Sequence, residues 1–167
     1  MALKVVLTYN VKKQPRTDEG LPLDFYAEFD DVETVDAIAH ALERGGCKVE
    51  KVEADEDAYD KLRKSRPNIV FNIAEGLRGE SRESHIPAML EMLGIPYTGS
   101  GPLTLAIALD KASTHQVLSY HGVPSPHFQV FRRPYEKTYK ELGFPVVVKP
   151  LSEGSSKGVR DCSLVRD

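Results

Sequence analysis

The sequence predicts an α/β protein with a Rossmann-like parallel sheet, followed by part of a second lobe. Short apolar runs alternate with amphipathic segments of helical period along the first hundred residues, which is typical of parallel strands joined by helices. A long helical segment follows from residue 102. After it, an apolar strand runs into a lysine and a small-residue loop at 142–158, which restarts the alternation.

The elements of the first half follow from hydrophobic period and turn residues. The first strand is a compact apolar run, and the loop after it contains Pro and Gly. The helix that follows has acids at its start, an apolar face with Val35 and Ile38, and Gly45–Gly46 at its end. In order, we expect a strand at 4–9, a loop at 10–24, a helix from 31, a strand at 47–52, a charged helix at 55–65 and a strand at 68–73.

The second half is richer in turn residues. Pro87 is tolerated in the first turn of a short helix around 86–93, and Pro102 suits the first position of a helix that reaches Gly122. Further strands are expected at 94–98, at 128–131 and before Lys149, with a helix at 134–142. We therefore divide the chain into a Rossmann-like N-terminal domain at 1–101, a linking helix at 102–123 and an incomplete lobe at 124–167.

Composition excludes several classes of protein. With 41% apolar and 28% charged residues, the 167-residue chain is typical of folded globular proteins, and a net charge of −3 with scattered Lys and Arg argues against nucleic acid as a partner. Cys47, Cys162 and the five histidines show no metal-ligand or disulfide spacing. Because no leader precedes the first strand and no apolar run approaches roughly 18 residues, we expect a cytoplasmic protein without a membrane partner.

The segment 142–158 carries the clearest chemistry. Its apolar strand runs into Lys149 and then into a loop of small residues. Glycines let backbone N–H groups converge on an anion, serines add hydroxyl donors, and a lysine at a strand end adds a positive charge. The pattern predicts a site for nucleotide phosphates. The alternative interpretation of Lys149 is an edge lysine without a ligand.

Several motifs recur together in the order of one known family. They are GIPYTGSG at 94–101, LDK at 109–111, GVP at 122–124, GFPVVVKP at 143–150 and EGSSKG at 153–158. Together they resemble the D-alanine–D-alanine ligases of the ATP-grasp superfamily, most strongly from Phe71 onward. The resemblance implies a three-domain protein, of which this chain is the first domain and part of the second.

The resemblance also implies roles for individual residues. Lysines matching Lys111 and Lys149 contact the ATP phosphates, the loop closes over them, and Ser155 acts catalytically by linking the loop to the amino-acid site. The residues expected to bind ATP are Lys111, Lys149, Glu153, Gly154, Ser155, Ser156 and Gly158. The family's magnesium ligands fall outside the matching part, so none is expected here. A solvated helical lysine is the alternative for Lys111.

The residues expected to bind amino acids depart from the family. Glu75–Gly76 stand where the family carries a His-Gly segment, and a carboxylate at a strand end can bind a substrate ammonium. The first loop lacks the family's Gly-Gly turn, so only Glu28, Asp30 or Asp31 could hold the ammonium of the first substrate. A plain loop acid is the alternative for Glu75. The departures leave the amino acid open.

Three functions remain. The first is a magnesium-dependent, ATP-consuming carboxylate–amine ligase that forms a D-alanyl dipeptide for peptidoglycan through an acyl-phosphate. This chain would be its N-terminal portion, inactive alone, and the full-length protein is expected to be a homodimer. The second is a related ligase for other amino acids or peptides, indicated by Glu75 and the first loop. The third is a non-catalytic domain that binds a nucleotide or a partner protein.

Overall fold

A computed structural model describes residues 2–13, 22–134, 136–139 and 141–166. Its N-terminal part contains a parallel sheet of order β2-β1-β3, formed by β1 (Lys4–Tyr9), β2 (Lys48–Glu53) and β3 (Ile69–Asn72). The central strand β1 is almost wholly buried, as a strand covered on both faces must be. The predicted α/β fold with a parallel sheet is confirmed.

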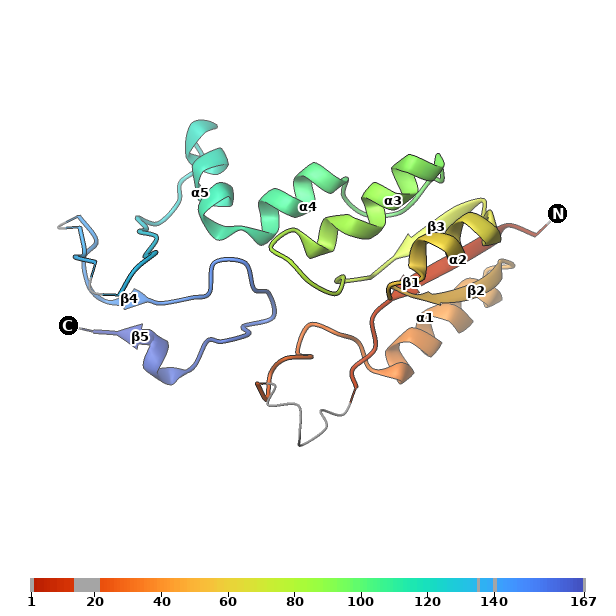
Figure 1. The fold of residues 1–167 in the computed structure, drawn as a ribbon, viewed down its shortest axis with the longest axis horizontal. Helices are drawn as coiled ribbons and strands as arrows, with labels where there is room; N and C mark the ends of the chain where they lie inside the picture. The colour runs from red at the N-terminus through yellow and green to blue at the C-terminus, as the bar shows by residue number, and fades with distance from the viewer. Residues whose placement is uncertain (1, 14–21, 135, 140, 167) are drawn as a thin grey trace.

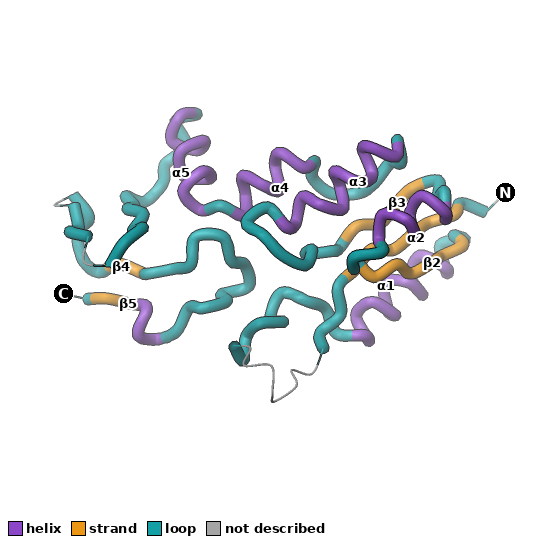
Figure 2. Tube along the Cα trace, viewed as in Figure 1, coloured by secondary structure: helices purple, strands orange, loops and turns teal. Residues whose placement is uncertain are grey.

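Helices cover both faces of this sheet (Figures 1 and 2). Because neighbouring strand residues point to opposite faces, Val6 and Leu7 of β1 belong to two different cores. Leu7 packs with Val35 and Ala39 of α1 (Val32–Arg44). The other core joins the sheet to α2 (Ala58–Ser65) and α3 (His85–Leu93) through Val6, Val52, Ala54, Ala58, Leu62, Val70, Ala74, Ile86 and Leu90.

The predicted elements of the first half are present, with shifted ends. The helix predicted at 55–65 begins only at Ala58, because the Asp55 carboxylate accepts the Asp57 N–H at 3.0 Å and holds a turn there. The segment predicted as a strand at 94–98 lies beside β3, with Val70 donating to the Pro96 carbonyl and Thr98 donating to the Val70 carbonyl. It forms one isolated bridge instead of a full strand. The loop prediction at 10–24 falls partly outside the described residues.

The single helix predicted from Pro102 to Gly122 was wrong. The structure has two helices, α4 (Pro102–Leu109) and α5 (Lys111–Tyr120), which meet at Asp110. The Asp110 carboxylate accepts the Ser113 N–H at 2.6 Å and caps α5. An aspartate that caps its own downstream backbone competes with helix continuation, which explains the break.

The C-terminal part departs furthest from prediction. It contains an antiparallel pair of two-residue strands, β4 (Val146–Val147) and β5 (Leu164–Val165), and the short 3-10 helix η2 (Asp161–Ser163). The predicted strand at 128–131 does not form, and the described residues of the predicted helix at 134–142 are not helical. Instead, the Gln129 side chain donates to the Lys137 carbonyl and accepts the Tyr139 N–H, which ties this segment into a loop.

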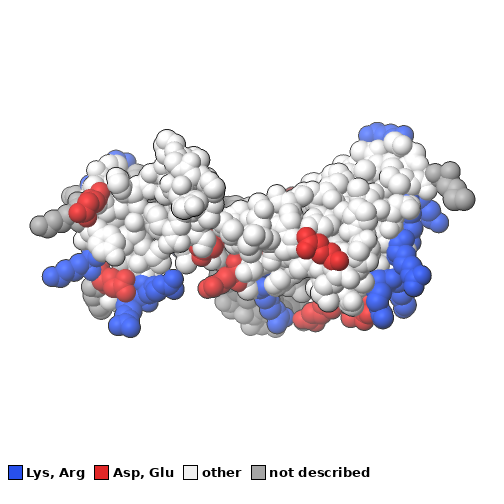
Figure 3. Space-filling view, turned by 90° about the horizontal axis from the view of Figure 1, so that it is seen from above, with Lys and Arg blue, Asp and Glu red and all other residues white. Residues whose placement is uncertain are grey.

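The two termini lie at opposite ends of an elongated molecule (Figure 1). The sheet occupies one end and the β4–β5 pair the other, with α3, α4 and α5 running along one side between them. Patches of Lys and Arg alternate with patches of Asp and Glu on the face seen in Figure 3, so this face has no single sign of charge. Among the described residues, no helix is long and apolar enough to cross a membrane.

Candidate functional site

The carboxyl end of the sheet shapes one side of the candidate site. Asn10 follows β1 and is buried, and its side-chain oxygen accepts the N–H groups of Glu75 at 3.0 Å and Gly76 at 2.9 Å. Gly76 has φ +79°, and a Cβ there would lie 2.2 Å from the Arg82 carbonyl oxygen. Only glycine fits such an approach, so Gly76 lets the chain fold back from β3 into the 3-10 helix η1 (Arg82–Ser84).

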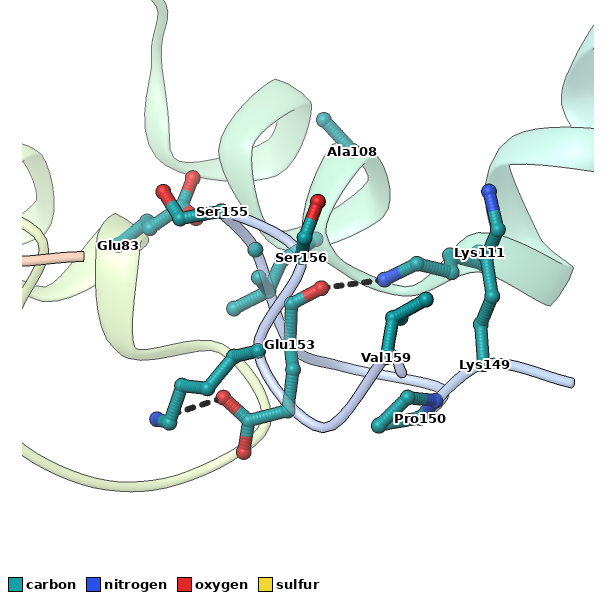
Figure 4. A pocket seen from close by; sticks show the side chains of 12 residues that line it. Glu83, Ala108, Lys111, Lys149, Pro150, Glu153, Ser155, Ser156 and Val159 are labelled. Atoms are coloured by element: carbon teal, nitrogen blue, oxygen red, sulfur yellow. Dashed lines mark hydrogen bonds and ion pairs between the residues drawn. The ribbon is translucent and has the colours of Figure 1, made fainter. Parts of the chain in front are cut away.

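The predicted phosphate loop lines a hollow of about 340 Å³ between α4, α5 and the segment after β4 (Figure 4). We call it the lysine hollow, because Lys111, Lys149 and Lys157 all lie on it. All but one of the predicted ATP-binding residues line it, the exception being Gly158. Its full lining is Glu83, Ala108, Leu109, Lys111, Lys149, Pro150, Glu153, Gly154, Ser155, Ser156, Lys157 and Val159.

The two lysines implied by the resemblance meet at this hollow. Lys111 is the first residue of α5, and its ammonium donates to the carbonyls of Leu151 and Glu153, the second of which is drawn in Figure 4. Burial and the nearby charge of Lys149 lower the pKa of Lys111. Lys149 itself is exposed, in the segment after β4. Two neighbouring cations favour an anion between them.

The loop adopts an unusual backbone conformation. Ser155 and Ser156 have φ of 45° and 59°, a left-handed region that residues other than glycine seldom occupy. Gly158 follows with φ +72°, and a Cβ there would lie 2.7 Å from Cγ of Pro150. The missing Cβ of Gly158 permits the close approach to Pro150, whereas Ser155 and Ser156 occupy their angles against the ordinary preference of the backbone.

Carboxylates from the N-terminal segment hold this turn. Oε1 of Glu28 accepts the Gly154 N–H at 2.5 Å, and Oδ2 of Asp24 accepts the Gly158 N–H at 2.8 Å. Burial alone would raise the pKa of Glu28, but hydrogen bonds from Arg82 and Gly154 bring it below its ordinary value. Of the acids predicted to bind a substrate ammonium, Glu28 is thus engaged with the loop.

A second hollow, of about 390 Å³, lies at the carboxyl end of β3. We call it the acidic hollow, because its charged lining residues are Asp30, Glu75 and Glu83. Asp31, by contrast, is exposed at the start of α1, 3.2 Å from the Lys12 ammonium. The other residues of the acidic hollow are Ile38, Asn72, Ile73, Ala74, Gly99, Ser100 and Leu105.

The surroundings of this hollow disfavour the ionised form of its three acids. Burial and the charges of Glu83, Glu28 and Asp30 raise the pKa of Glu75 to about 7. Burial also raises the pKa of Glu83 and of Asp30. Carboxylates that repel one another in a partly buried site favour either a proton or a cation between them.

Glu83 lines both hollows, so the two meet at η1. One side offers ammonium groups, hydroxyls and backbone N–H groups, and the other offers carboxylates. A strongly shifted pKa in a concave site, such as that of Glu75, marks a candidate for chemistry. The arrangement can therefore hold an anion and an ammonium group close to each other.

Sequence reasoning missed two residues that shape the site. Arg82 is buried, although it lies in a segment rich in charged residues after β3. Asp24 bonds to the loop across 134 residues of sequence. Neither belongs to a recognisable motif, so only the fold reveals them.

The described residues include no group of three or more His, Cys, Asp or Glu side chains that could hold a metal ion. Asp30, Glu75 and Glu83 share a hollow but do not form such a group. The donor set needed for magnesium is therefore not found in the part of the chain that the structure describes.

Comparisons of sequence place the chain among known proteins, although no protein-family model matches it. It is 41% identical over 133 residues to the uncharacterised protein y4sG of Sinorhizobium fredii, covering 75% of this chain and 39% of the relative. It is 38% identical over 131 residues to the D-alanine–D-alanine ligase of Syntrophotalea carbinolica, covering 78% of this chain and 41% of the relative. The chain thus spans about two fifths of the length of these relatives.

Solved structures share the whole fold. The D-alanine–D-alanine ligase from Bacillus anthracis matches with a TM-score of 0.72 at 26% identity, over 99% of this chain and 50% of that chain. The structure of that ligase complexed with ATP matches with a TM-score of 0.70 at 23% identity, over 99% of this chain and 51% of that chain. The sheet, the helices and the C-terminal segment therefore follow one known arrangement.

Proposed function

We infer a function from the premise that this chain belongs to the D-alanine–D-alanine ligase family, as an N-terminal portion of such a protein. We propose that it supplies the phosphate-binding loop and the amino-acid face of an ATP-dependent carboxylate–amine ligase. The observation that carries the proposal is the junction of the lysine hollow with the acidic hollow at Glu83.

The reaction of such a ligase has two steps. A carboxylate oxygen of the first substrate attacks the γ-phosphorus of ATP, which forms an acyl-phosphate and releases ADP. The amine of the second substrate then attacks the acyl carbon, phosphate leaves, and the amine loses a proton. The first step builds negative charge on the transferred phosphoryl oxygens, and the second builds it on the acyl oxygen and then on the departing phosphate, so preorganised cations and N–H donors lower both barriers.

The lysine hollow suits the anionic part of this reaction. In our proposal Lys111 and Lys149 neutralise the phosphates, while Ser155 and Ser156 offer hydroxyl groups from the loop. In the structure the Lys111 ammonium bonds to backbone carbonyls of the same loop, so those carbonyls already fix its position. A positioned charge needs little reorganisation when a phosphate arrives.

The acidic hollow suits the amino-acid part. Its carboxylates repel one another, and an incoming ammonium group would relieve this repulsion. We propose Glu75 and Asp30 as the acids that face the substrate, with Glu83 next to the reacting groups. Ser155 would link the two hollows, because it lines the lysine hollow beside Glu83, which lines both (Figure 4).

D-alanine is the first substrate to consider, because relatives that are 38% identical over about three quarters of this chain are D-alanine–D-alanine ligases. Formation of a D-alanyl dipeptide would supply peptidoglycan synthesis. The resemblance also implies magnesium, but the described residues do not fit it, so we assign magnesium no ligand in this chain and no step.

A second candidate is a ligase of the same kind that joins other amino acids. The observation that favours it is Glu75, whose carboxyl lies among other acids where the resemblance expects a histidine. A site with this much negative charge would favour a substrate richer in cationic groups than alanine.

We propose that residues 1–101 form one unit and 124–167 part of another, joined by α4 and α5 with their bend at Asp110. Because the chain matches only two fifths of its relatives, we expect the complete catalytic site to need more of the protein.

ADP release by the whole protein, measured over a panel of D- and L-amino acids, tests the proposal. We expect ATP turnover that depends on an amino acid. If the protein is a D-alanine–D-alanine ligase, D-alanine alone should activate this turnover. Activation by a diamino acid and not by D-alanine would favour the second. Nucleotide binding without any amino-acid-dependent ADP release would contradict the ligase proposal and favour a non-catalytic nucleotide-binding domain.

A further inference from the structure

Arg82 joins three segments that are far apart in the sequence. Its side chain is only 8% exposed. Nη2 contacts both carboxylate oxygens of Glu28, at 2.6 and 2.7 Å, and lies 3.0 Å from Oε2 of Glu153, while Nη1 donates to the Ser152 carbonyl at 2.8 Å. These partners lie 54, 70 and 71 residues away. A planar guanidinium can serve several acceptors at once, which an ammonium group cannot do in the same geometry.

Glu28 connects Arg82 to the loop. The oxygen that accepts from Arg82 also accepts the Gly154 N–H, and a Cβ on Gly154 would lie 2.8 Å from it. At the other end of the loop, Asp24 accepts the Gly158 N–H at 2.8 Å. The segment that carries Asp24 and Glu28 is therefore hydrogen-bonded to the loop at both ends.

Two residues between these hydrogen bonds have unfavourable backbone angles. Ser155 and Ser156 both have positive φ, and such conformations persist only where surrounding contacts impose them. Lys157 adds to these contacts, because its ammonium lies 2.8 Å from Glu153 and 5.4 Å from the centre of the Phe25 ring. The shape of the loop thus depends on a network with Arg82 at its centre.

We propose that Arg82 is a positioning residue that holds the 153–158 loop in the shape that lines the lysine hollow. The next residue, Glu83, lines both hollows, so a shift of η1 on the acidic side would reach the loop through Arg82. The ligand of the loop rests on the function proposed above, whereas the positioning of the loop does not.

Amide hydrogen exchange of the full chain tests this role, with Arg82→Met compared with Arg78→Met. Arg78 is a matched control because its side chain is 85% exposed and, among the described residues, pairs only with the exposed Glu56. We expect exchange of the Gly154 and Gly158 amides to rise at least ten-fold in Arg82→Met, with amides of β1 and α3 unchanged, and no change in Arg78→Met. Unchanged loop exchange, or an equal rise in β1 and α3, would overturn the proposal.

Arg82→Lys covers the case in which Arg82→Met does not fold. Lysine keeps the positive charge but lacks the planar set of N–H donors of the guanidinium, so it cannot donate to Glu28 and to the Ser152 carbonyl at the same time. We expect Arg82→Lys to fold and its Gly154 amide to exchange faster than that of the wild type. The Gly154 amide of Arg78→Lys should exchange at the wild-type rate. Wild-type exchange at Gly154 in Arg82→Lys would count against a positioning role.

Calorimetric titration with ATP separates this inference from the proposed function. We expect Arg82→Lys to bind ATP at least ten-fold more weakly than the wild type, and Arg78→Lys to bind equally well. Equal ATP affinity in Arg82→Lys and the wild type would overturn the inference and leave the proposed function standing. No ATP binding by the wild type, with faster loop exchange in the Arg82 variants, would contradict the proposed function and support the positioning role.

Discussion

The two ends of the molecule are built differently. In the part of the chain that the structure describes, every buried apolar core residue except Leu109 precedes residue 91. The C-terminal segment has two-residue strands, and its large apolar side chains, including Phe128, Phe131, Phe144, Val147 and Val148, are exposed. The sheet end is therefore held by its own core, whereas the loop end is held mainly by hydrogen bonds and ion pairs to the other half.

This difference bears on function. The acidic hollow lies on the well-packed sheet, while the lysine hollow combines α4 and α5 with a segment that packs little on its own. Sites on rigid elements hold their geometry, and mobile loops carry out closure. We therefore expect changes at the sheet end to alter stability, and changes at the loop end to alter local order.

The largest expected effect is at the sheet end. Leu90→Ala removes a fully buried side chain from the core between sheet and helices and should lower the free energy of unfolding by about 3 kcal/mol. Val147→Ala, at a half-exposed position in β4, should cost less than about 0.5 kcal/mol. Urea denaturation followed by circular dichroism measures both. Similar losses for the two variants would remove the contrast between the ends.

The second effect concerns pH. The pKa of Glu75, about 7 in the folded chain, lies above its ordinary value, so folding favours its protonated form. The unfolded chain loses this proton near pH 4.5, so stability should fall as pH rises from about 4.5 to about 7. At about 1.4 kcal/mol per pKa unit, discounted for solvent screening, the loss is roughly 2 kcal/mol.

Glu75→Gln removes this dependence and should be more stable than the wild type at pH 7.5, whereas the two should differ little near pH 4.5. Urea denaturation of both proteins at several pH values measures the difference in their free energies of unfolding. The groups that act on Glu75 are Glu83, Glu28, Asp30 and Arg82. Parallel pH profiles in the two proteins would mean that the acidic hollow does not strain Glu75.

A third effect separates local order from global stability. Gly158→Ala places a methyl group 2.7 Å from Pro150 at φ +72°, which should cost about 1–2 kcal/mol. Because the loop end has little core, we expect faster proteolysis between residues 150 and 160, with the unfolding of the sheet nearly unchanged. Gly46→Ala is the control, since it has positive φ but open space around it. An equal change in both variants would mean that close contact with Pro150 has no effect.

The smallest effect is at the bend between α4 and α5. Asp110→Ala removes the carboxylate that caps α5 and should cost about 1 kcal/mol. Asp110→Asn keeps an acceptor and should cost less. Thermal unfolding of the two variants compares them, and a more stable Asp110→Ala would indicate one continuous helix, as the sequence suggested.

Much of the sheet end could be predicted from the sequence, because period and turn residues determine it locally. Val35 and Ala39 on one face of α1, and the apolar run of β1, were recognisable without any tertiary contact. The bend at Asp110 was missed because apolar residues continue on both sides of it. The strand predicted around Phe128–Phe131 did not form, since a strand needs partners and none pairs with this segment in the described chain.

The candidate site could be predicted only in part. Motif order drew attention to Lys111, Lys149 and the loop, and the structure brings them to one hollow. The exposure of Lys149 and the contacts of Arg82 with Glu28 could not be foreseen, because burial and pairing across 54 residues leave no local pattern. Of the acids predicted to bind a substrate ammonium, Glu75 and Asp30 line the acidic hollow and Glu28 and Asp31 do not, while Glu83, which lines it too, was not predicted.

ATP binding at the lysine hollow is tested most directly by following backbone amide signals in NMR while ATP is added to the full chain. We expect saturable shifts at Lys111 and at Gly154, Ser155, Ser156 and Gly158, and their loss in the Lys111→Met/Lys149→Met double variant. Lys64→Met, on the charged helix α2, should respond as the wild type does. Absence of shifts in the 153–158 loop, or shifts that persist in the double variant, would contradict ATP binding at this hollow.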